Sequence, residues 1–242
     1  MFLTLMMTVC WYQVPGMGPS EKEQKQKQIN MLHEESMEAA KIYAQLMQKG
    51  LDAGLLTQLG EEFVKVSKPI QAKACFGEAL KLKADHQAAK DGLAKSEKRL
   101  AFLNGRLETF QKKMTKDNNY QFGCRSASIL FHMGETTQAL ELLGDLRQQF
   151  GRNGEIMSME KTFSSGDELR YSLMRDLSNR FSGSVKTGSL DGALEELGKL
   201  MFLSLGDLPV TPYMERLQKA FPKQVNHANL KTALQFLVPE VA

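Results

Sequence analysis

The side chains that could bind a metal ion are scattered through this chain of 242 residues. The four histidines are His33, His86, His132 and His227. None of them has a second histidine or a cysteine at the spacing of zinc ligands, and His33-Glu34-Glu35 lacks the second histidine of a zinc-protease helix. The sequence therefore predicts no metal site and no cofactor.

The three cysteines, Cys10, Cys75 and Cys124, show no spacing typical of disulfides. Cys75 lies between Ala74 and Phe76, a setting that predicts a buried free thiol. Unpaired thiols favour a reducing compartment over a secreted scaffold, so the sequence predicts a cytoplasmic protein.

No motif matches the active site of an enzyme. Ser164-Ser165-Gly166 is typical of a helix cap and not of a nucleophile elbow. Adjacent acidic residues, such as Glu61-Glu62 and Glu195-Glu196, point to different sides of a helix and are expected on a solvated surface, because neighbours in sequence do not face each other there. No glycine-rich loop has the strand-turn-helix setting of a phosphate site. We therefore expect a protein without enzymatic activity.

The elements that must position any site are predicted to be helices. Ala, Leu, Met, Gln, Lys and Glu are plentiful, Val, Ile and Thr are sparse, and no segment alternates like a strand. The fold is therefore predicted to be all-α. Apolar spacing and capping residues predict helices over 20–49, 52–66, 69–84, 86–114, 120–132, 136–150, 167–181, 189–205, 211–220 and 227–237, with a break at 182–183 and no assignment for 155–165.

We predict three regions along the chain. Residues 1–19 begin with an apolar arm, which packs on the body or, as the alternative, exports or anchors the protein through residues 1–16. Residues 20–116 hold one clear helical hairpin at 53–86 and a basic helix at 86–114. The turn cluster at 115–119 then separates a second helical region, 117–242.

The positive charge is concentrated in one segment. The net charge is +3, yet residues 81–116 carry 10 basic and 4 acidic side chains. A basic patch is predicted from Lys90, Lys95, Lys98, Arg99, Arg106, Lys112 and Lys113. It could neutralise the phosphates of nucleic acid or of an anionic membrane, or act only as a solvated face. Base stacking would need exposed aromatic rings among the basic residues, but Phe102 and Phe110 are predicted to be core.

A short pattern occurs twice in the second half of the chain. Segments 134–146 and 188–200 share the form G-x4-A-L-E-x-L-G-x-L. In each, the glycine opens a turn, and the alanine and the leucines recur on one helical face. The repetition predicts two helical hairpins of common design.

Residues 56–84 resemble the tetratricopeptide repeat, a helical hairpin of 34 residues. The matching positions are Leu56, Leu59, Gly60 and Phe63 on the first helix, and Ala72, Phe76 and Ala79 on the second. Ala84 stands where the family has a terminal proline. A second, weaker copy matches the family at Ala127, Leu130, Ala139 and Leu143, and a third copy lies around Ala193. The resemblance implies stacked antiparallel hairpins in an α-solenoid.

The resemblance also implies a function. In the family, first helices line a groove that holds a partner peptide, which places candidate contacts at Thr57, Glu61, Val64, Lys65, Gln121, Arg125, Ser128 and His132. The expected function is a non-enzymatic adaptor or assembly scaffold that binds a peptide or helix of another protein. The alternative is a basic module that binds nucleic acid or an anionic membrane.

Overall fold

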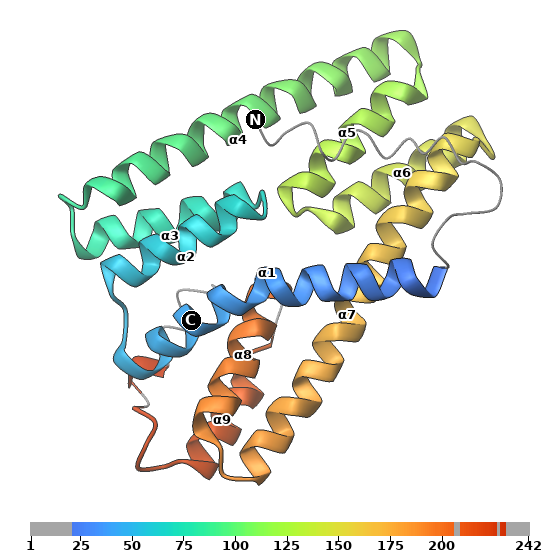
Figure 1. Cartoon of the computed structure of the whole chain (residues 1–242). Helices are drawn as coiled ribbons and strands as arrows, with labels where there is room; N and C mark the ends of the chain where they lie inside the picture. Colours follow the sequence, from blue (N-terminus) through green and yellow to red (C-terminus); the bar gives the residue numbers. More distant parts are fainter. Residues whose placement is uncertain (1–20, 206–208, 227, 231–242) are drawn as a thin grey trace.

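The computed structural model describes residues 21–205, 209–226 and 228–230, and this part of the chain contains helices and no strand (Figure 1). The all-α prediction is confirmed. The helices are α1 (Glu21–Lys49), α2 (Ala53–Lys65), α3 (Pro69–Leu82), α4 (Gln87–Asp117), α5 (Tyr120–Met133), α6 (Thr136–Phe150), α7 (Gly154–Lys186), α8 (Leu190–Ser204) and α9 (Thr211–Ala220).

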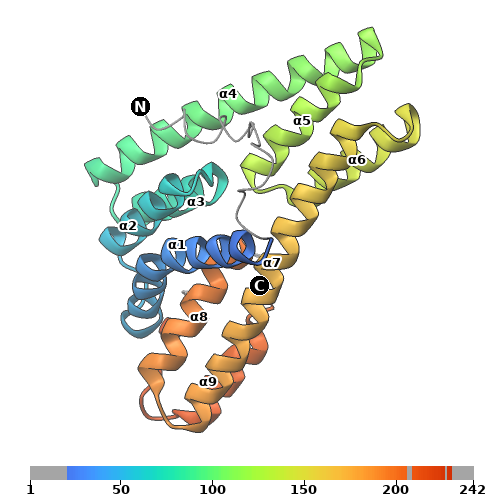
Figure 2. The same ribbon diagram turned by 45° about the vertical axis from the view of Figure 1, so that its right-hand side comes forward.

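Helices α2 to α8 each pack against the next helix along the chain. Helix α1 packs most extensively against α8 and also contacts α2, so the succession of neighbours closes on itself (Figures 1 and 2). An open solenoid would leave its first and last helices apart. Contact between α1 and α8, which lie near opposite ends of the described chain, is a feature that the resemblance to stacked repeats does not imply.

The hairpin of α2 and α3 is built around the ring of Phe76. A Cβ atom on Gly60 of α2 would lie 2.7 Å from this ring, and one on Gly92 of α4 would lie 2.5 Å from it. Ala72 and Ala79 of α3 are fully buried. The small residues of the predicted repeat therefore do allow close helix approach, and Gly92 extends the same contact to the next helix.

The repeated pattern has the same structural meaning in both copies. Gly134 and Gly188 adopt φ angles of 95° and 76°, a left-handed conformation that favours glycine, just before α6 and α8. The alanine and the last two leucines of both copies are buried: Ala139, Leu143 and Leu146 in α6, and Ala193, Leu197 and Leu200 in α8. The two copies differ at the glycine inside the helix, Gly144 in α6 and Gly198 in α8. Only Gly198 lies beneath another helix, α1.

Helix α7 is longer than predicted. It runs without interruption through the expected cap at 164–166 and the expected break at 182–183, and both expectations are wrong. Phe163, Leu173, Leu177 and Phe181 are buried at helical spacing, so packing carries the helix across these weak points. The hydroxyl of Ser182 is satisfied within the helix, where it donates to the carbonyl of Ser178 at 3.0 Å.

The turn expected near 115–119 is present but does not divide the core. Asn118 has a φ angle of 46°, and the Oδ1 atom of Asn119 caps α5 by accepting from the N–H of Gln121 at 2.9 Å. One hydrophobic cluster joins α1, α2 and α3 to α7, α8 and α9 across this turn. A boundary between residues 116 and 117 therefore does not separate two cores.

Two expectations fall on the ends of the chain. The arm at 1–19, with its targeting alternative through 1–16, lies outside the described residues, as does most of the helix predicted at 227–237. Among the helices that the structure describes, none has a stretch both long and apolar enough to cross a bilayer.

Candidate binding surfaces

The thiols of the described residues are not suited to nucleophilic chemistry. Cys75 is buried, as predicted, and burial raises the pKa of its thiol. Burial also raises the pKa of Cys124 to about 11. Because the thiolate is the reactive form, both groups are inert near neutral pH. Within the described ranges, no group of three or more His, Cys, Asp or Glu side chains could hold a metal ion.

The α2 part of the predicted groove is only partly accessible. Thr57 is buried, and its hydroxyl donates to the carbonyl of Ala53 at 2.7 Å, so its assignment to a groove is wrong. Glu61, Val64 and Lys65 are exposed. The Lys65 amine pairs with Glu62 at 2.6 Å, and Glu61 adds a further negative charge to this surface.

The α5 part of the predicted groove lies on a different helix pair. Gln121, Arg125 and His132 are exposed, and Ser128 is half-buried. Helix α2 packs mainly against α1 and α3, whereas α5 packs mainly against α4 and α6. The structure therefore does not bring the two sets of groove candidates together on one pair of helices.

Instead, Arg125 joins residues of the predicted basic patch on the hairpin of α4 and α5. We call this surface the arginine–phenylalanine face, and it consists of Arg99, Phe102, Arg106, Phe110 and Lys113 of α4 with Phe122 and Arg125 of α5. Cationic groups and aromatic rings alternate along it, and the alternation passes from one helix to the other.

Along α4, the guanidinium carbons of Arg99 and Arg106 lie 5.8 Å and 5.6 Å from the centre of the Phe102 ring. Arg106 also lies 5.3 Å from the centre of the Phe110 ring. These distances are in the range of cation–π interactions. Each arginine of this helix is therefore held beside at least one ring.

The contacts continue onto α5. The guanidinium carbon of Arg125 lies 5.7 Å from the ring centre of Phe110 and 5.6 Å from that of Phe122. The Nζ atom of Lys113 lies 5.5 Å from the Phe122 ring centre, and the rings of Phe110 and Phe122 stack with centres 6.1 Å apart. The face is thus one continuous set of contacts between two helices.

Phe102 is more exposed than the sequence predicts. It was predicted to be core, but 52% of it is exposed, because Leu103 and Leu107 occupy the positions of α4 that turn inward. Phe110 is half-buried and packs on the cluster around Leu103 and Ile129. Only the Phe110 expectation therefore holds, and only in part.

The positive charge of the face is not compensated. Among the ion pairs of the described residues, none involves Arg99, Arg106, Lys113 or Arg125. The remaining patch candidates are exposed on α4 but contact no ring of the face: Lys90, Lys95, Lys98 and Lys112. The predicted basic patch is therefore divided between the face and the rest of α4.

Comparisons with protein-family models, with curated proteins and with solved structures gave no match for this chain. The likeness to tetratricopeptide repeats rests on residue spacing alone. Any function must therefore be argued from the geometry and charge of the described surfaces.

His132, another groove candidate, lies at the edge of a polar region in which Lys68 and Arg170 are half-buried. The loss of surrounding water, together with the charges of Lys68 and Arg99, lowers the pKa of its imidazole. Burial and the charge of Arg170 lower the pKa of Lys68, and the charge of Glu35 opposes them. This polar region thus gathers side chains from α1, α4, α5, α7 and the start of α3.

Hydrogen bonds tie this region to the end of α8. The side-chain amide of Gln71 donates to the carbonyl of Leu205 at 3.4 Å. The Arg170 guanidinium pairs with Asp167 at 2.7 Å and donates to the carbonyl of Leu203 at 3.5 Å. Sequence reasoning missed this region, because its members come from distant segments and share no motif.

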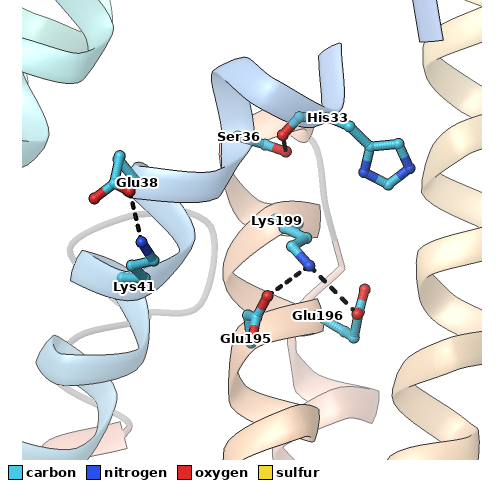
Figure 3. Close-up of polar contacts among 7 residues, drawn as sticks. All are labelled: His33, Ser36, Glu38, Lys41, Glu195, Glu196 and Lys199. Atoms are coloured by element: carbon cyan, nitrogen blue, oxygen red, sulfur yellow. Dashed lines mark hydrogen bonds and ion pairs between the residues drawn. The ribbon is translucent and has the colours of Figure 1, made fainter. Parts of the chain in front are cut away.

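A second polar contact lies where α1 crosses α8. Figure 3 shows the Lys199 amine between Glu195 and Glu196, at 2.7 Å and 3.4 Å, close to His33 and Ser36 of α1. The Glu196 side chain is only 15% exposed. The expectation of a solvated pair is therefore wrong for Glu196.

We expect the protein to lose stability as the pH falls from 7 to 5. Burial lowers the pKa of His33, with help from Arg180 and Lys199, and the pKa of His132 is lowered as described above. Below about pH 6.5 the unfolded chain takes up protons at these histidines before the folded chain does, so acid favours unfolding. Thermal melts at pH 7.5 and 5.5 should show a larger drop in Tm for the wild type than for a His33→Gln, His132→Gln double variant.

A Glu35 contribution is shared by both proteins and cancels in this comparison. Burial raises the pKa of Glu35, so the folded chain takes up this proton before the unfolded chain does. As the pH falls towards the unfolded pKa, this carboxyl therefore stabilises the protein, which is opposite to the effect of the histidines. An equal drop in Tm for the two proteins would contradict the assignment to the histidines.

Proposed function

We propose that this chain is a non-enzymatic adaptor or assembly scaffold, which binds a segment of another protein on the arginine–phenylalanine face. The observation that carries the proposal is an exposed ring, Phe102, held between the unpaired guanidinium groups of Arg99 and Arg106. Aromatic and arginine side chains are the types most enriched among the residues that dominate protein interfaces.

The other described groups that could take part in chemistry also favour binding over catalysis. Cys75 and Cys124 hold protonated thiols, and the acidic side chains Glu195 and Glu196 are engaged by Lys199. The face consists of arginine, lysine and phenylalanine side chains and contributes no histidine, carboxyl or thiol group as a general acid or base. The face would contribute positive charge, which speeds encounter with an oppositely charged partner. The ring of Phe102 would supply apolar contact.

The proposal divides the predicted groove into two surfaces that can be tested separately. Lys65 lies on α2 in an ion pair with Glu62, whereas Arg125 lies on the face and has no ion pair among the described residues. We therefore expect Lys65→Glu to leave partner binding unchanged and Arg106→Glu with Arg125→Glu to abolish it. The control is Lys90→Glu with Lys112→Glu, which makes the same change in net charge elsewhere on the described surface.

The test is quantitative affinity capture from nuclease-treated lysate, followed by mass spectrometry. A protein retained by the wild type, by Lys65→Glu and by the control, and depleted at least tenfold by the face variant, would agree with the proposal. Recovery of the same proteins by all four chains would contradict it.

A further inference from the structure

We infer that the arginine–phenylalanine face accepts an acidic, extended segment of the partner protein, whose carboxylates bind the outer edges of Arg99, Arg106 and Arg125. This inference rests on the proposed function and adds the chemistry of the partner. A guanidinium group presents its N–H donors in its own plane, and carboxylates meet these donors two at a time. An arginine that lies over a ring keeps those edges free for such contacts.

The rings fix where the guanidinium groups lie. Arg106 contacts two rings of α4, and Arg125 contacts one ring of each helix. A free arginine side chain loses conformational entropy when it binds an anion, and that loss is a free-energy cost of binding. Contacts that already restrict the arginines reduce this cost.

The spacing of the arginines suits an extended chain. Arg99 and Arg106 are seven residues apart on α4, which corresponds to a rise of about 10.5 Å. A chain in the extended polyproline II conformation advances about 3.1 Å per residue and turns once every three residues, so carboxylates three positions apart point to the same side and lie about 9 Å from each other. An acidic residue at every third position is therefore the simplest complementary pattern.

A single-stranded nucleic acid fits the face less well. Bases bind such surfaces mainly by stacking on exposed ring faces. Here arginines lie over the ring of Phe102 and over those of Phe110 and Phe122. A base would have to displace an arginine that its own phosphates need. The whole chain, with a net charge of only +3 and a pI of about 8.6, also lacks the strongly basic character typical of nucleic-acid-binding domains.

The face is also unsuited to a partner that is mainly apolar. Phe102 is its only large apolar side chain that is mostly exposed, since Phe110 and Phe122 are half-buried. Helix α4 lies along the outer edge of the described molecule in both ribbon views (Figures 1 and 2). Charge complementarity therefore points to an acidic occupant.

The experiment measures the binding of fluorescent probes to the full chain by anisotropy at 50 mM and 200 mM salt. The acidic probe is an 18-residue peptide, (Glu-Ser-Gly)6, and its neutral control is (Gln-Ser-Gly)6. Two further arms use dT12 and phosphatidylserine vesicles. The variants are Arg99→Glu with Arg106→Glu, the exposed-ring variant Phe102→Ala, and the control Lys90→Glu with Lys112→Glu.

We expect the acidic peptide to bind the wild type and the control at least tenfold more tightly than it binds Arg99→Glu with Arg106→Glu. Phe102→Ala should weaken binding several-fold without a change in Tm, which separates loss of the site from loss of folding. The neutral peptide should not bind, and 200 mM salt should weaken the complex.

Three outcomes would overturn the inference. If the acidic peptide does not bind while affinity capture recovers a protein that depends on the face, the adaptor function stands and the acidic partner is wrong. If dT12 or the vesicles bind through the face and the acidic peptide does not, both proposals fail. Equal binding of the acidic peptide to the face variant and to its control would show that the site lies elsewhere.

Discussion

Phe76→Ala is expected to lower the free energy of unfolding by about 3–5 kcal/mol, the usual cost of removing a large buried aromatic side chain. Phe76 is 1% exposed, and its ring fills the space between Gly60 of α2 and Gly92 of α4. Neither glycine has a side chain that could move into the vacated volume. The cavity would therefore remain open, and the cost should lie near the upper end of this range.

Urea denaturation of the wild type and the variant would measure this effect. Phe102→Ala is the matched control, since it makes the same substitution on a helix surface where the ring is 52% exposed. Its free energy of unfolding should change by about 0.5 kcal/mol or less. Similar losses for the two variants would show that Phe76 does not occupy the centre of the α2–α3–α4 contact.

Gly198→Ala is expected to destabilise the protein by about 1–3 kcal/mol, although alanine is the better helix former. A Cβ atom at this position would lie 2.7 Å from the carbonyl oxygen of Ala40 and 3.0 Å from its Cα atom. Both are backbone atoms of α1, so no side-chain rotation can relieve the clash. Helix α1 would have to move away from α8.

Gly144→Ala provides the control within the same repeated pattern. Gly144 is the equivalent residue of α6, and apart from its chain neighbours and its own helix backbone no atom lies within 4 Å of the Cβ that alanine would add. The substitution should stabilise the protein by up to about 1 kcal/mol through helix propensity. Thermal melts of the two variants should therefore shift in opposite directions, and a shift of the same sign would argue against the close crossing of α1 and α8.

Local sequence signals were sufficient where the determining contacts are close in the chain. Asp52 caps α2, where its carboxylate accepts from the N–H of Leu55 at 2.9 Å, and Pro69 begins α3, both as the sequence predicts. Cys75 and Ala72 are buried at the spacing of one helical face. Such features depend on hydrogen bonds and periodicity within a few turns.

The same signals were insufficient where distant packing outweighs a local preference. The serines and glycine at 164–166 and the pair at 182–183 favour a helix end, yet α7 continues through both, since buried Phe163 and Phe181 hold it in the core. Phe102 was predicted to be buried but is exposed. The prediction failed because apolar spacing along α4 cannot by itself distinguish the side of the helix that meets α3 and α5 from the side next to it.

The sequence by itself determined an all-α chain, the close packing of its clearest hairpin and the excess of positive charge in one segment, because these follow from composition, spacing and sign. Only the tertiary structure decided that α1 returns to α8 and that Arg125 of α5 joins Arg99, Arg106 and Lys113 of α4 around exposed Phe102. These associations depend on how helices far apart in the chain cross one another. That geometry is set by the sum of many packing contacts, and no single motif encodes it.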